Sequence, residues 1–265
     1  MKIGFIGAGN MAKAMMKGII ASQIVRADEI FASDAFLPAL EKVKNEFGIN
    51  ITQDNKEIAK ECNIVFLAIK PQFYNTVIEE IKSCIKENSI IISIAPGQTL
   101  KSLEERFGRE LKIVRTMPNT PAMVCEGMTA ICKNKFVTEE EIQFVVKIIE
   151  AFGKAAIVNE YMMDAVVAAS GSAPAYVYLF IEAIADGAVM EGMPRDLAYK
   201  FAAQTVLGSA KMVLETGMHP GALKDMVCSP AGTTIEAIRV LEKEGFRSSV
   251  IEAMKACVNK ARSLK

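Results

Sequence analysis

The sequence has few of the residues that bind metal ions. It contains a single histidine, His219, and its six cysteines include no CxxC pair. Without such pairs or further histidines, no recognisable zinc or iron–sulfur ligand set can be assembled. Scattered thiols in a chain of this size are also more typical of a reducing compartment than of a disulfide framework. We therefore expect no metal site and a cytoplasmic protein.

The chain also lacks an excess charge of either sign. Its 31 Lys and Arg residues balance 31 Asp and Glu residues, and its isoelectric point is about 6.6. A neutral chain has no overall field that would attract nucleic acid or an anionic membrane surface. We expect neither of these as a partner.

Export signals and long apolar runs are lacking as well. The N-terminal residues have neither the basic flank nor the long apolar region of a signal peptide. The longest uncharged run, residues 165–181, contains Ser170–Pro174, which signals the start of a helix and divides the run in two. We expect this run to be buried core rather than a membrane span.

The 265 residues are 51% hydrophobic and 23% charged, which is typical of one or two globular domains with a large core. Up to Asn159, short β-branched apolar runs alternate with amphipathic stretches, as in a parallel sheet between helices. The expected strands are residues 2–6, 29–33, 63–69, 89–94, 112–115, 128–132 and 155–158. The expected helices between them are residues 11–20, 38–47, 74–85, 100–107 and 139–152. The sequence thus predicts an α/β, doubly wound, Rossmann-type domain over residues 1–159.

Residues 160–265 contain no further strand pattern, and helical stretches are separated there by Gly and Pro. Within Pro174–Glu191 the polar residues are sparse, so this helix would be apolar on nearly every side. So small a domain cannot cover such a helix by itself, which favours burial in a subunit interface. We predict an all-α dimerisation domain over residues 160–265.

A glycine-rich loop lies between the first expected strand and the first expected helix. Gly7–Ala12 fits the G-x-G-x-x-G/A fingerprint of dinucleotide-binding domains. Gly7 allows a tight turn, Gly9 lets the backbone approach a pyrophosphate, and free N–H groups at the helix start face the phosphates. The predicted cofactor contacts here are Ile6, Gly7, Ala8, Gly9, Asn10 and Met11.

Three further loops follow expected strands and are candidates for cofactor contacts. Asp34 lies roughly 20 residues beyond the glycines, where a carboxylate reads the ribose and favours NADH over NADPH; alternatively it is a turn residue or helix cap. Ala68 lies at the end of the strand expected at 63–69, and Lys70 and Pro71 follow it, although Lys70 could instead be a snorkelling lysine. The loop Met117–Pro121, stiffened by two prolines, could hold a polar side chain beside the nicotinamide.

A second glycine-containing loop precedes a helix that begins near Ile235. Ser229–Thr234 offers two threonine hydroxyls and several free N–H groups, where the helix dipole favours an anion. This is the outline of a carboxylate pocket. Alone, the pattern is more often only a capped helix start.

Together these motifs resemble the pyrroline-5-carboxylate reductase family from end to end. The resemblance is carried by Phe5–Ala12, Ala68–Pro71, Met117–Pro121, Ser170–Tyr176 and, most diagnostically, His219–Asp225 running into Ser229–Thr234. It implies NADH- or NADPH-dependent reduction of 1-pyrroline-5-carboxylate to L-proline, the last step of proline biosynthesis. It also implies a helical domain that interleaves with its copy in a dimer, with dimers often assembled into rings.

The resemblance also assigns residues. It implies that Gly232, Thr233 and Thr234 bind the substrate carboxylate and ring nitrogen with Glu160 nearby, and that Asn55 joins Lys70 in holding the cofactor. One departure is Asp34, since many relatives have a small polar residue there that tolerates a 2′-phosphate. We expect Thr234 to be the catalytic hydroxyl that donates to the ring nitrogen, because a protonated imine needs no strong side-chain acid. His219 is expected at a helix entry.

Two other functions are compatible with parts of the sequence. A β-hydroxyacid dehydrogenase or related imine reductase would share the glycine loop and the helical domain. The hydroxyacid enzymes use a lysine on the long central helix, whereas Pro174–Glu191 contains none. A nucleotide-sensing or scaffold protein would keep the fold without turnover.

Overall fold

The computed structural model describes residues 1–263, and they divide into two compact units. The first unit consists of Met1–Ser172 together with the described residues from Cys257 onward, and the second is Ala173–Ala256. The predicted domain boundary after Asn159 follows the last strand, whereas contacts group residues 160–172 with the first unit. That boundary therefore stays a prediction about domain organisation.

The first unit is built on an eight-stranded sheet with the order β3-β2-β1-β4-β5-β6-β7-β8. All neighbours are parallel except β6 and β7. The strands are β1 (Ile3–Ile6), β2 (Ile30–Ser33), β3 (Asn50–Thr52), β4 (Ile64–Leu67), β5 (Ile90–Ser93), β6 (Lys112–Met117), β7 (Gly127–Lys133) and β8 (Gly153–Ile157). Because strand order reverses between β1 and β4, the carboxyl ends of these two strands form the topological switch point where such folds bind ligands.

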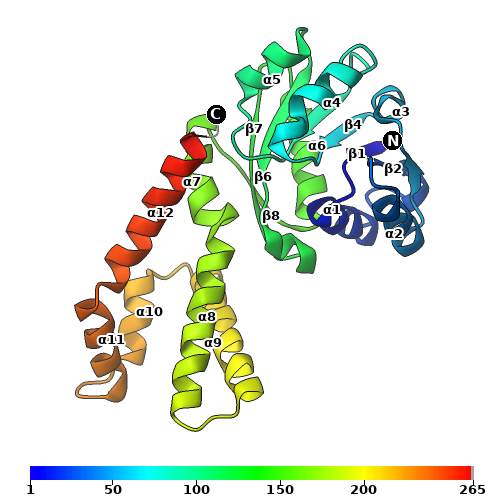
Figure 1. The fold of residues 1–265 in the computed structure, drawn as a ribbon. Coiled ribbons are helices and arrows are strands. Elements are labelled where there is room, and N and C mark those ends of the chain that lie inside the picture. The colour runs from blue at the N-terminus through cyan, green and yellow to red at the C-terminus, as the bar shows by residue number, and fades with distance from the viewer. Residues whose placement is uncertain (264–265) are drawn as a thin grey trace. The chain divides into compact units, whose positions relative to one another are not determined.

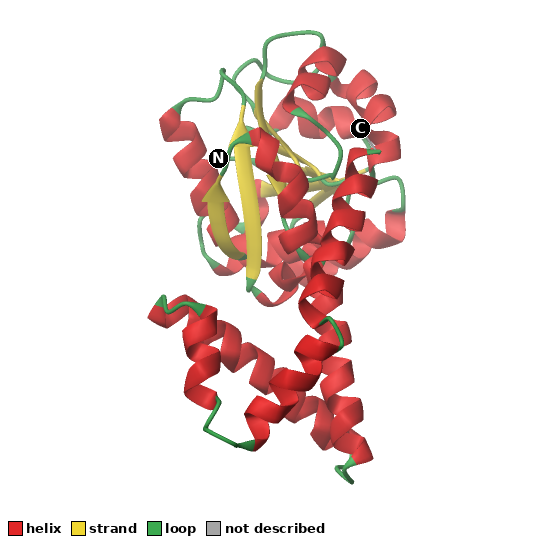
Figure 2. Cartoon of the chain, turned by 90° about the vertical axis from the view of Figure 1, so that its left-hand side faces the viewer, coloured by secondary structure: helices red, strands yellow, loops and turns green. Residues whose placement is uncertain are grey.

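Helices cover both faces of this sheet (Figures 1 and 2). They are α1 (Asn10–Ala21), α2 (Leu37–Phe47), α3 (Asn55–Glu61), α4 (Tyr74–Ile81), α5 (Leu100–Phe107), α6 (Glu139–Glu150) and α7 (Met163–Val166). Short 3-10 turns lie at Ala27–Glu29, Pro71–Phe73, Thr120–Val124 and Glu160–Met162, and a π turn lies at Val167–Gly171. The doubly wound architecture predicted from the sequence is confirmed.

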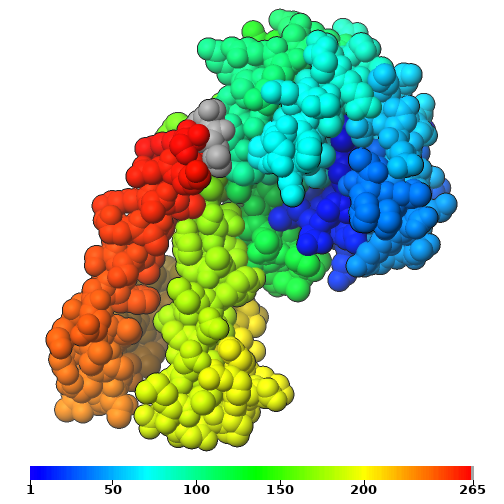
Figure 3. Space-filling model, viewed as in Figure 1, coloured from blue at the N-terminus to red at the C-terminus, as the bar shows by residue number. Residues whose placement is uncertain are grey.

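Two apolar cores hold these layers together. One packs α1, α2 and α6 against the sheet, with the rings of Phe5 and Phe66 stacked 4.7 Å apart at its centre. The other packs α3, α4 and α5 against the opposite face, around buried side chains such as Ile78 and Leu103. Every residue of β1, β4 and β5 is buried, as expected for central parallel strands. Figure 3 shows the atoms of the first unit as a closely packed surface on the face turned to the viewer.

All seven predicted strands are present, but two elements of this unit were missed. The edge strand β3 has three residues and no continuous apolar run, so nothing in its sequence marks it. Helix α3 is short, and its start is marked by Asp54, whose side chain accepts a hydrogen bond from Lys56 N. That capping signal could have been found from the sequence.

The chain returns to the first unit through its last helix, α12 (Phe246–Arg262). The chain leaves the first unit after Ser172 and re-enters it at Cys257. At this point Cys257 Sγ lies 3.3 Å from Ser172 Oγ. Further along, Arg262 Nε lies 3.5 Å from a carboxylate oxygen of Asp164 in α7. The end of α12 and α7 lie side by side in Figure 1. The second unit is therefore inserted between two neighbouring positions of the first.

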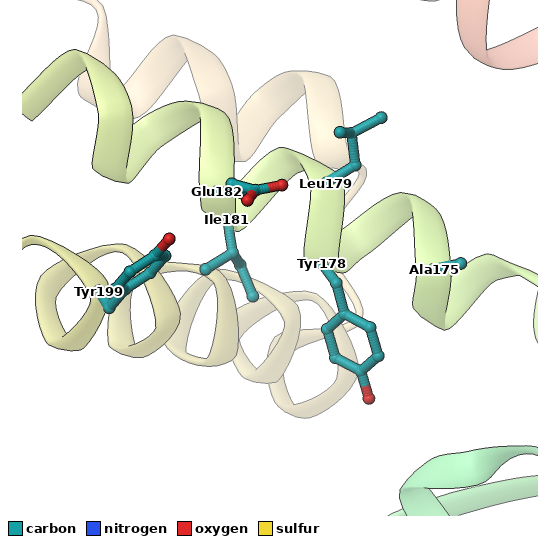
Figure 4. Close-up of a pocket in the computed structure, with 6 residues that line it drawn as sticks. All are labelled: Ala175, Tyr178, Leu179, Ile181, Glu182 and Tyr199. Atoms are coloured by element: carbon teal, nitrogen blue, oxygen red, sulfur yellow. The ribbon is translucent and has the colours of Figure 1, made fainter.

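The second unit contains only helices: α8 (Ala173–Met190), α9 (Arg195–Thr216), α10 (Pro220–Val227), α11 (Thr233–Lys243) and the first part of α12. Its core is small, and the buried hydrophobic residues among those described are Ala185, Ala198 and Ala202. Large apolar side chains are exposed instead. Leu179 is 68% exposed, and Figure 4 shows Ile181 pointing from α8 toward α9 while Leu179 points away from it.

The helical run Glu160–Met190 is long and apolar enough to cross a membrane by length and composition, and 11% of its most apolar window is buried. Of residues 165–181, which were expected to be buried core, Val167 and Ala168 are the buried ones, so that expectation is wrong for the single chain. The reason is that helices of the second unit leave most of the surface of α8 uncovered. Apolar surface exposed on this scale marks a site that another surface covers.

Candidate cofactor and substrate sites

The carboxyl ends of β1, β2 and β4 surround a cavity of about 400 Å³ in the first unit. Its lining residues include Gly7, Gly9, Asp34, Asn55 and Lys70. A second cavity of about 350 Å³ shares Gly9, Ala68, Ile69 and Lys70 with the first, so the two adjoin. Their position at the switch point is where an open α/β sheet binds nucleotides.

The glycine loop has the geometry that its sequence predicts. Gly7 has φ of +105°, and a Cβ there would lie 2.4 Å from the carbonyl oxygen of Ala68, so only glycine fits. Its N–H donates to Ser33 O at 2.7 Å, which ties the loop to β2. A Cβ on Gly9 would meet nothing within 4 Å, so this side of the loop is open.

Helix α1 begins immediately after this open glycine, and no side chain caps its first turn. The unpaired N–H groups and the positive end of the helix dipole therefore face the cavity, where they favour a phosphate. The open glycine and the uncapped helix have the chemistry that a dinucleotide pyrophosphate requires.

Asp34 connects the glycine loop to the turn after β2. Its Oδ2 accepts a hydrogen bond from Ala8 N at 2.8 Å, and its Oδ1 accepts one from Phe36 N at 2.9 Å. The residue therefore is part of a turn, as the alternative interpretation of the sequence held, and it also lines the cavity. Each carboxylate oxygen retains a lone pair that can accept from a ribose hydroxyl.

The structure brings the predicted cofactor residues together. All except Ala8 line one or both cavities: Ile6, Gly7, Gly9, Asn10, Met11, Asp34, Asn55, Ala68, Lys70 and Pro71. Ala8 is buried and contributes its N–H to Asp34. Sequence reasoning missed Ile94–Pro96, which line the second cavity after β5. Their position at the end of a parallel strand was the signal that could have found them.

The loop after β6 also lines the second cavity, through Met117–Thr120. The amide of Asn119 is almost fully buried, and its Oδ1 accepts from Met128 N at 2.9 Å. Its Nδ2 lies 3.2 Å from Ser170 Oγ in the π turn. The polar side chain of this loop thus holds β7 and the π turn in place.

Tyr74 and Ser93 form a buried polar contact beneath these loops. The tyrosine hydroxyl lies 2.9 Å from Leu67 O and 3.0 Å from Ser93 Oγ. Burial raises the pKa of Tyr74 to about 12, so the hydroxyl stays protonated and can donate. The contact fixes the ends of β4 and β5, and with them the loops that line both cavities.

Glu160 has partners within the first unit. Its Oε1 accepts from Leu100 N at 2.7 Å and from the Arg115 guanidinium at 3.0 Å. Glu160 therefore helps to cap α5 and neutralises an arginine that is almost fully buried on β6. Cys132 pairs with Arg115 on the neighbouring strand β7, and burial raises the pKa of its thiol to about 12, with Glu160 adding to the shift and Arg115 opposing it. The place of Glu160 beside a substrate stays a prediction.

The predicted substrate loop lies in the second unit, at the start of α11. Gly232 is the N-cap residue, and no side chain caps the helix, so its first N–H groups are unpaired as an anion site requires. Ala231 before it has φ of +55°, and a Cβ on Gly232 would lie 2.3 Å from Ser229 Oγ. The loop is thus closely folded, and it presents Thr233 and Thr234 at the first turn of the helix.

His219 is the N-cap of α10. Its Nδ1 accepts a hydrogen bond from Gly221 N at 3.0 Å. This is the position at a helix entry that the sequence predicted for the histidine.

Two family models match the chain. One described as pyrroline-5-carboxylate reductase dimerisation matches residues 160–264, and one described as NADP oxidoreductase, coenzyme F420-dependent, matches residues 2–97. The chain is also 53% identical to the pyrroline-5-carboxylate reductase of Escherichia coli (strain K12), over 99% of this chain and 98% of that relative.

Solved structures agree with these matches. The pyrroline-5-carboxylate reductase of Coxiella burnetii is 37% identical with a TM-score of 0.93, covering 100% of this chain and 98% of that chain. A pyrroline carboxylate reductase of Plasmodium falciparum with NADP bound is 35% identical with a TM-score of 0.90, covering 99% of this chain and 97% of that chain. With the cavities at the switch point and the uncapped start of α11, these similarities show that the chain belongs to the pyrroline-5-carboxylate reductase family.

Proposed function

We propose that this chain transfers a hydride from NADH or NADPH to the cyclic imine of 1-pyrroline-5-carboxylate and releases L-proline, the last step of proline biosynthesis. The observation that carries the proposal is full-length similarity to reductases of this name, at up to 53% identity, in a chain that retains both the glycine loop and the Gly232–Thr234 helix start.

The residues of the first unit would hold the cofactor. The N–H groups at the start of α1 face its pyrophosphate, Asp34 accepts from the adenosine ribose, and Asn55 and Lys70 line the same cavity. The reduced nicotinamide supplies the hydride when it is bound. Asp34 favours NADH, because a carboxylate accepts from the 2′-hydroxyl and repels a 2′-phosphate.

The residues of the second unit would hold the imine. The N–H of Gly232 is bonded to Ser229 O, so the uncapped N–H groups of Thr233 and Thr234 that follow it suit the carboxylate, and the hydroxyl of Thr234 would donate to the ring nitrogen. Catalysis then rests on positioning and on one hydrogen bond to developing charge rather than on a strong side-chain acid. We keep Glu160 as a candidate substrate contact that acts together with its partner Arg115.

We further propose a homo-oligomer built from dimers. The exposed apolar surface of α8 and α9 needs cover, and a second copy supplies an identical apolar surface. The match of residues 160–264 to a dimerisation model supports a protein partner rather than lipid or nucleic acid. We also propose a cytoplasmic location, which the scattered cysteines of the sequence support.

Oxidation of reduced nicotinamide, followed by the loss of absorbance at 340 nm, tests the reaction. We expect rapid loss with 1-pyrroline-5-carboxylate and slower loss with larger or decarboxylated cyclic imines. Normal NADH binding without turnover of any imine would favour a nucleotide-sensing or scaffold protein instead. Hydroxyacid oxidation is disfavoured, because α8 contains no lysine that could act as its acid and base.

A further inference from the structure

Asn55 is held by hydrogen bonds on both sides of its amide. Its Oδ1 lies 2.7 Å from Ser33 Oγ at the end of β2, and its Nδ2 lies 2.9 Å from Glu80 Oε2 in α4. Ser33 is fully buried, Asn55 is half-buried, and Glu80 is partly exposed. The three residues come from separate elements, and only Ser33 and Asn55 line the first cavity.

The chemistry of the three groups decides which way the amide faces. An ionised carboxylate has no hydrogen to donate, so Glu80 can pair only with the nitrogen of Asn55. The amide oxygen must then face Ser33, whose hydroxyl has to donate. A serine hydroxyl alone would not fix this orientation, since it can donate to the oxygen or accept from the nitrogen. Glu80 is therefore the group that sets the orientation of Asn55.

We propose that Glu80 is a positioning residue for the cofactor, acting from outside the cavity through the amide of Asn55. The inference rests on the proposed function, because it takes the first cavity to be the place where the reduced nicotinamide dinucleotide binds. With the amide fixed, the second N–H and the second oxygen lone pair of Asn55 point in constant directions. A bound dinucleotide then meets a preformed donor and acceptor and does not have to order them.

The test measures the Kd of NADH by fluorescence titration without imine, so it is independent of turnover. We expect Glu80→Ala to weaken binding about 3- to 10-fold, the value of one hydrogen bond of ordinary strength. Glu80→Gln can donate as well as accept, so it no longer fixes the direction of the Asn55 amide and should weaken binding about 3- to 10-fold as alanine does. Glu79→Ala is the matched control, since Glu79 is the preceding residue of α4 and pairs with Lys82 at the surface.

A double-mutant cycle identifies the route. If Glu80 acts only through Asn55, the variant Glu80→Ala/Asn55→Ala should bind NADH no more weakly than Asn55→Ala alone. With imine present, the KM for NADH should rise by a larger factor than kcat falls. Glu80→Leu, which keeps most of the bulk of the side chain, replaces the alanine variant if thermal unfolding shows that the latter does not fold.

Three results would overturn the proposal: a Kd in Glu80→Ala equal to that in Glu79→Ala, additive losses in the double variant, or a Kd in Glu80→Gln equal to that of the unmodified protein. The last result would mean that a side chain able only to accept is not what sets the orientation of Asn55. Failure of the proposed function looks different, since NADH would bind and respond to Glu80 as described while no imine is reduced.

Discussion

The two units of the chain bury their apolar side chains in different ways. The first unit closes two cores around central strands whose residues are all buried. Among the described residues of the second unit, by contrast, the buried hydrophobic ones are three alanines, while large side chains such as Leu179 and Phe201 are exposed. Burial of apolar surface is the main favourable term in folding. The first unit therefore has the core of an independent domain, and the second depends on a further surface.

The largest expected effect concerns the chemical contribution of the second unit. Replacing Thr234 with alanine removes one hydrogen bond to developing charge, and we expect kcat/KM for the imine to fall by about 10- to 1000-fold. Binding of NADH, which we assign to the first unit, should not change. Thr234→Ser retains the hydroxyl and serves as the control. Unchanged turnover in the alanine variant would remove Thr234 from the mechanism.

The next effect concerns the glycine loop of the first unit. Gly7→Ala places a Cβ 2.4 Å from Ala68 O at a positive φ, so the loop must shift, and we expect NADH to bind about 100-fold more weakly. Gly48→Ala is the matched control, because it has a similar left-handed backbone but open space around its Cβ. It should cost only about 1 kcal/mol of stability. Comparable loss of NADH binding in both variants would contradict the role of close backbone approach.

A charged residue on α8 tests the dependence of the second unit on a partner. Leu179→Glu should weaken the dimer by about 10- to 100-fold, since it places a carboxylate in an apolar interface. Light scattering over a range of protein concentrations measures the change. Leu37→Glu, an exposed apolar position on α2 of the first unit, is the control. Dimers of unaltered stability in Leu179→Glu would show that this face of α8 is not the interface.

Cofactor preference should respond to a single residue of the first unit. Asp34→Ser removes the carboxylate that accepts from Ala8 N and that would repel a 2′-phosphate. We expect the ratio of kcat/KM for NADPH to that for NADH to rise about tenfold, because a carboxylate next to a phosphate costs on the order of 1 kcal/mol. A strong preference of the unmodified protein for NADPH would refute the ribose argument.

The smallest expected effect is a loss of stability at alkaline pH, which arises from three buried groups of the first unit. Burial raises the pKa values of Cys62, Cys132 and Tyr74 to about 12, above their ordinary values of 9 and 10. These groups stay protonated in the folded state but ionise in the unfolded state, so they contribute stability that is present below pH 9 and lost toward pH 12.

Urea unfolding followed by circular dichroism at pH 8, 9 and 10 measures this loss. Each group lowers the free energy of unfolding by at most about 1.4 kcal/mol for each unit of rising pH. Cys62→Ala should reduce the slope by the share of that thiol. A slope that is the same in this variant and in the unmodified protein would show that Cys62 is already accessible in the folded state.

The comparison also explains what could be predicted from the sequence. The central strands and the glycine loop carry dense local signals, because buried parallel strands are continuous apolar runs and a positive φ beside a close backbone contact requires glycine. The apolar character of α8 gave the right reason to expect an interface. The short edge strand β3 carries no such signal and was missed.

Contacts between distant elements could not be predicted. The pairing of Glu160 with Arg115 joins residues 45 positions apart, and the contact of Asn55 with Glu80 depends on how α3 and α4 pack on one face of the sheet. No periodicity or spacing in the sequence encodes either pairing. These are the contacts that decide how a predicted site residue is oriented.

The return of α12 to the first unit bears on how the protein is made. Cys257 pairs with Ser172 where the chain leaves and re-enters the first unit, so Met1–Ser172 and the described end of α12 belong to the same body. During synthesis, the Rossmann sheet can form as soon as β8 has emerged from the ribosome, but its last helical segment arrives only after the whole intervening bundle has been translated. Completion of the first unit therefore waits for translation of the whole bundle, and premature termination within the bundle would leave a nucleotide-binding fragment without its closing helix.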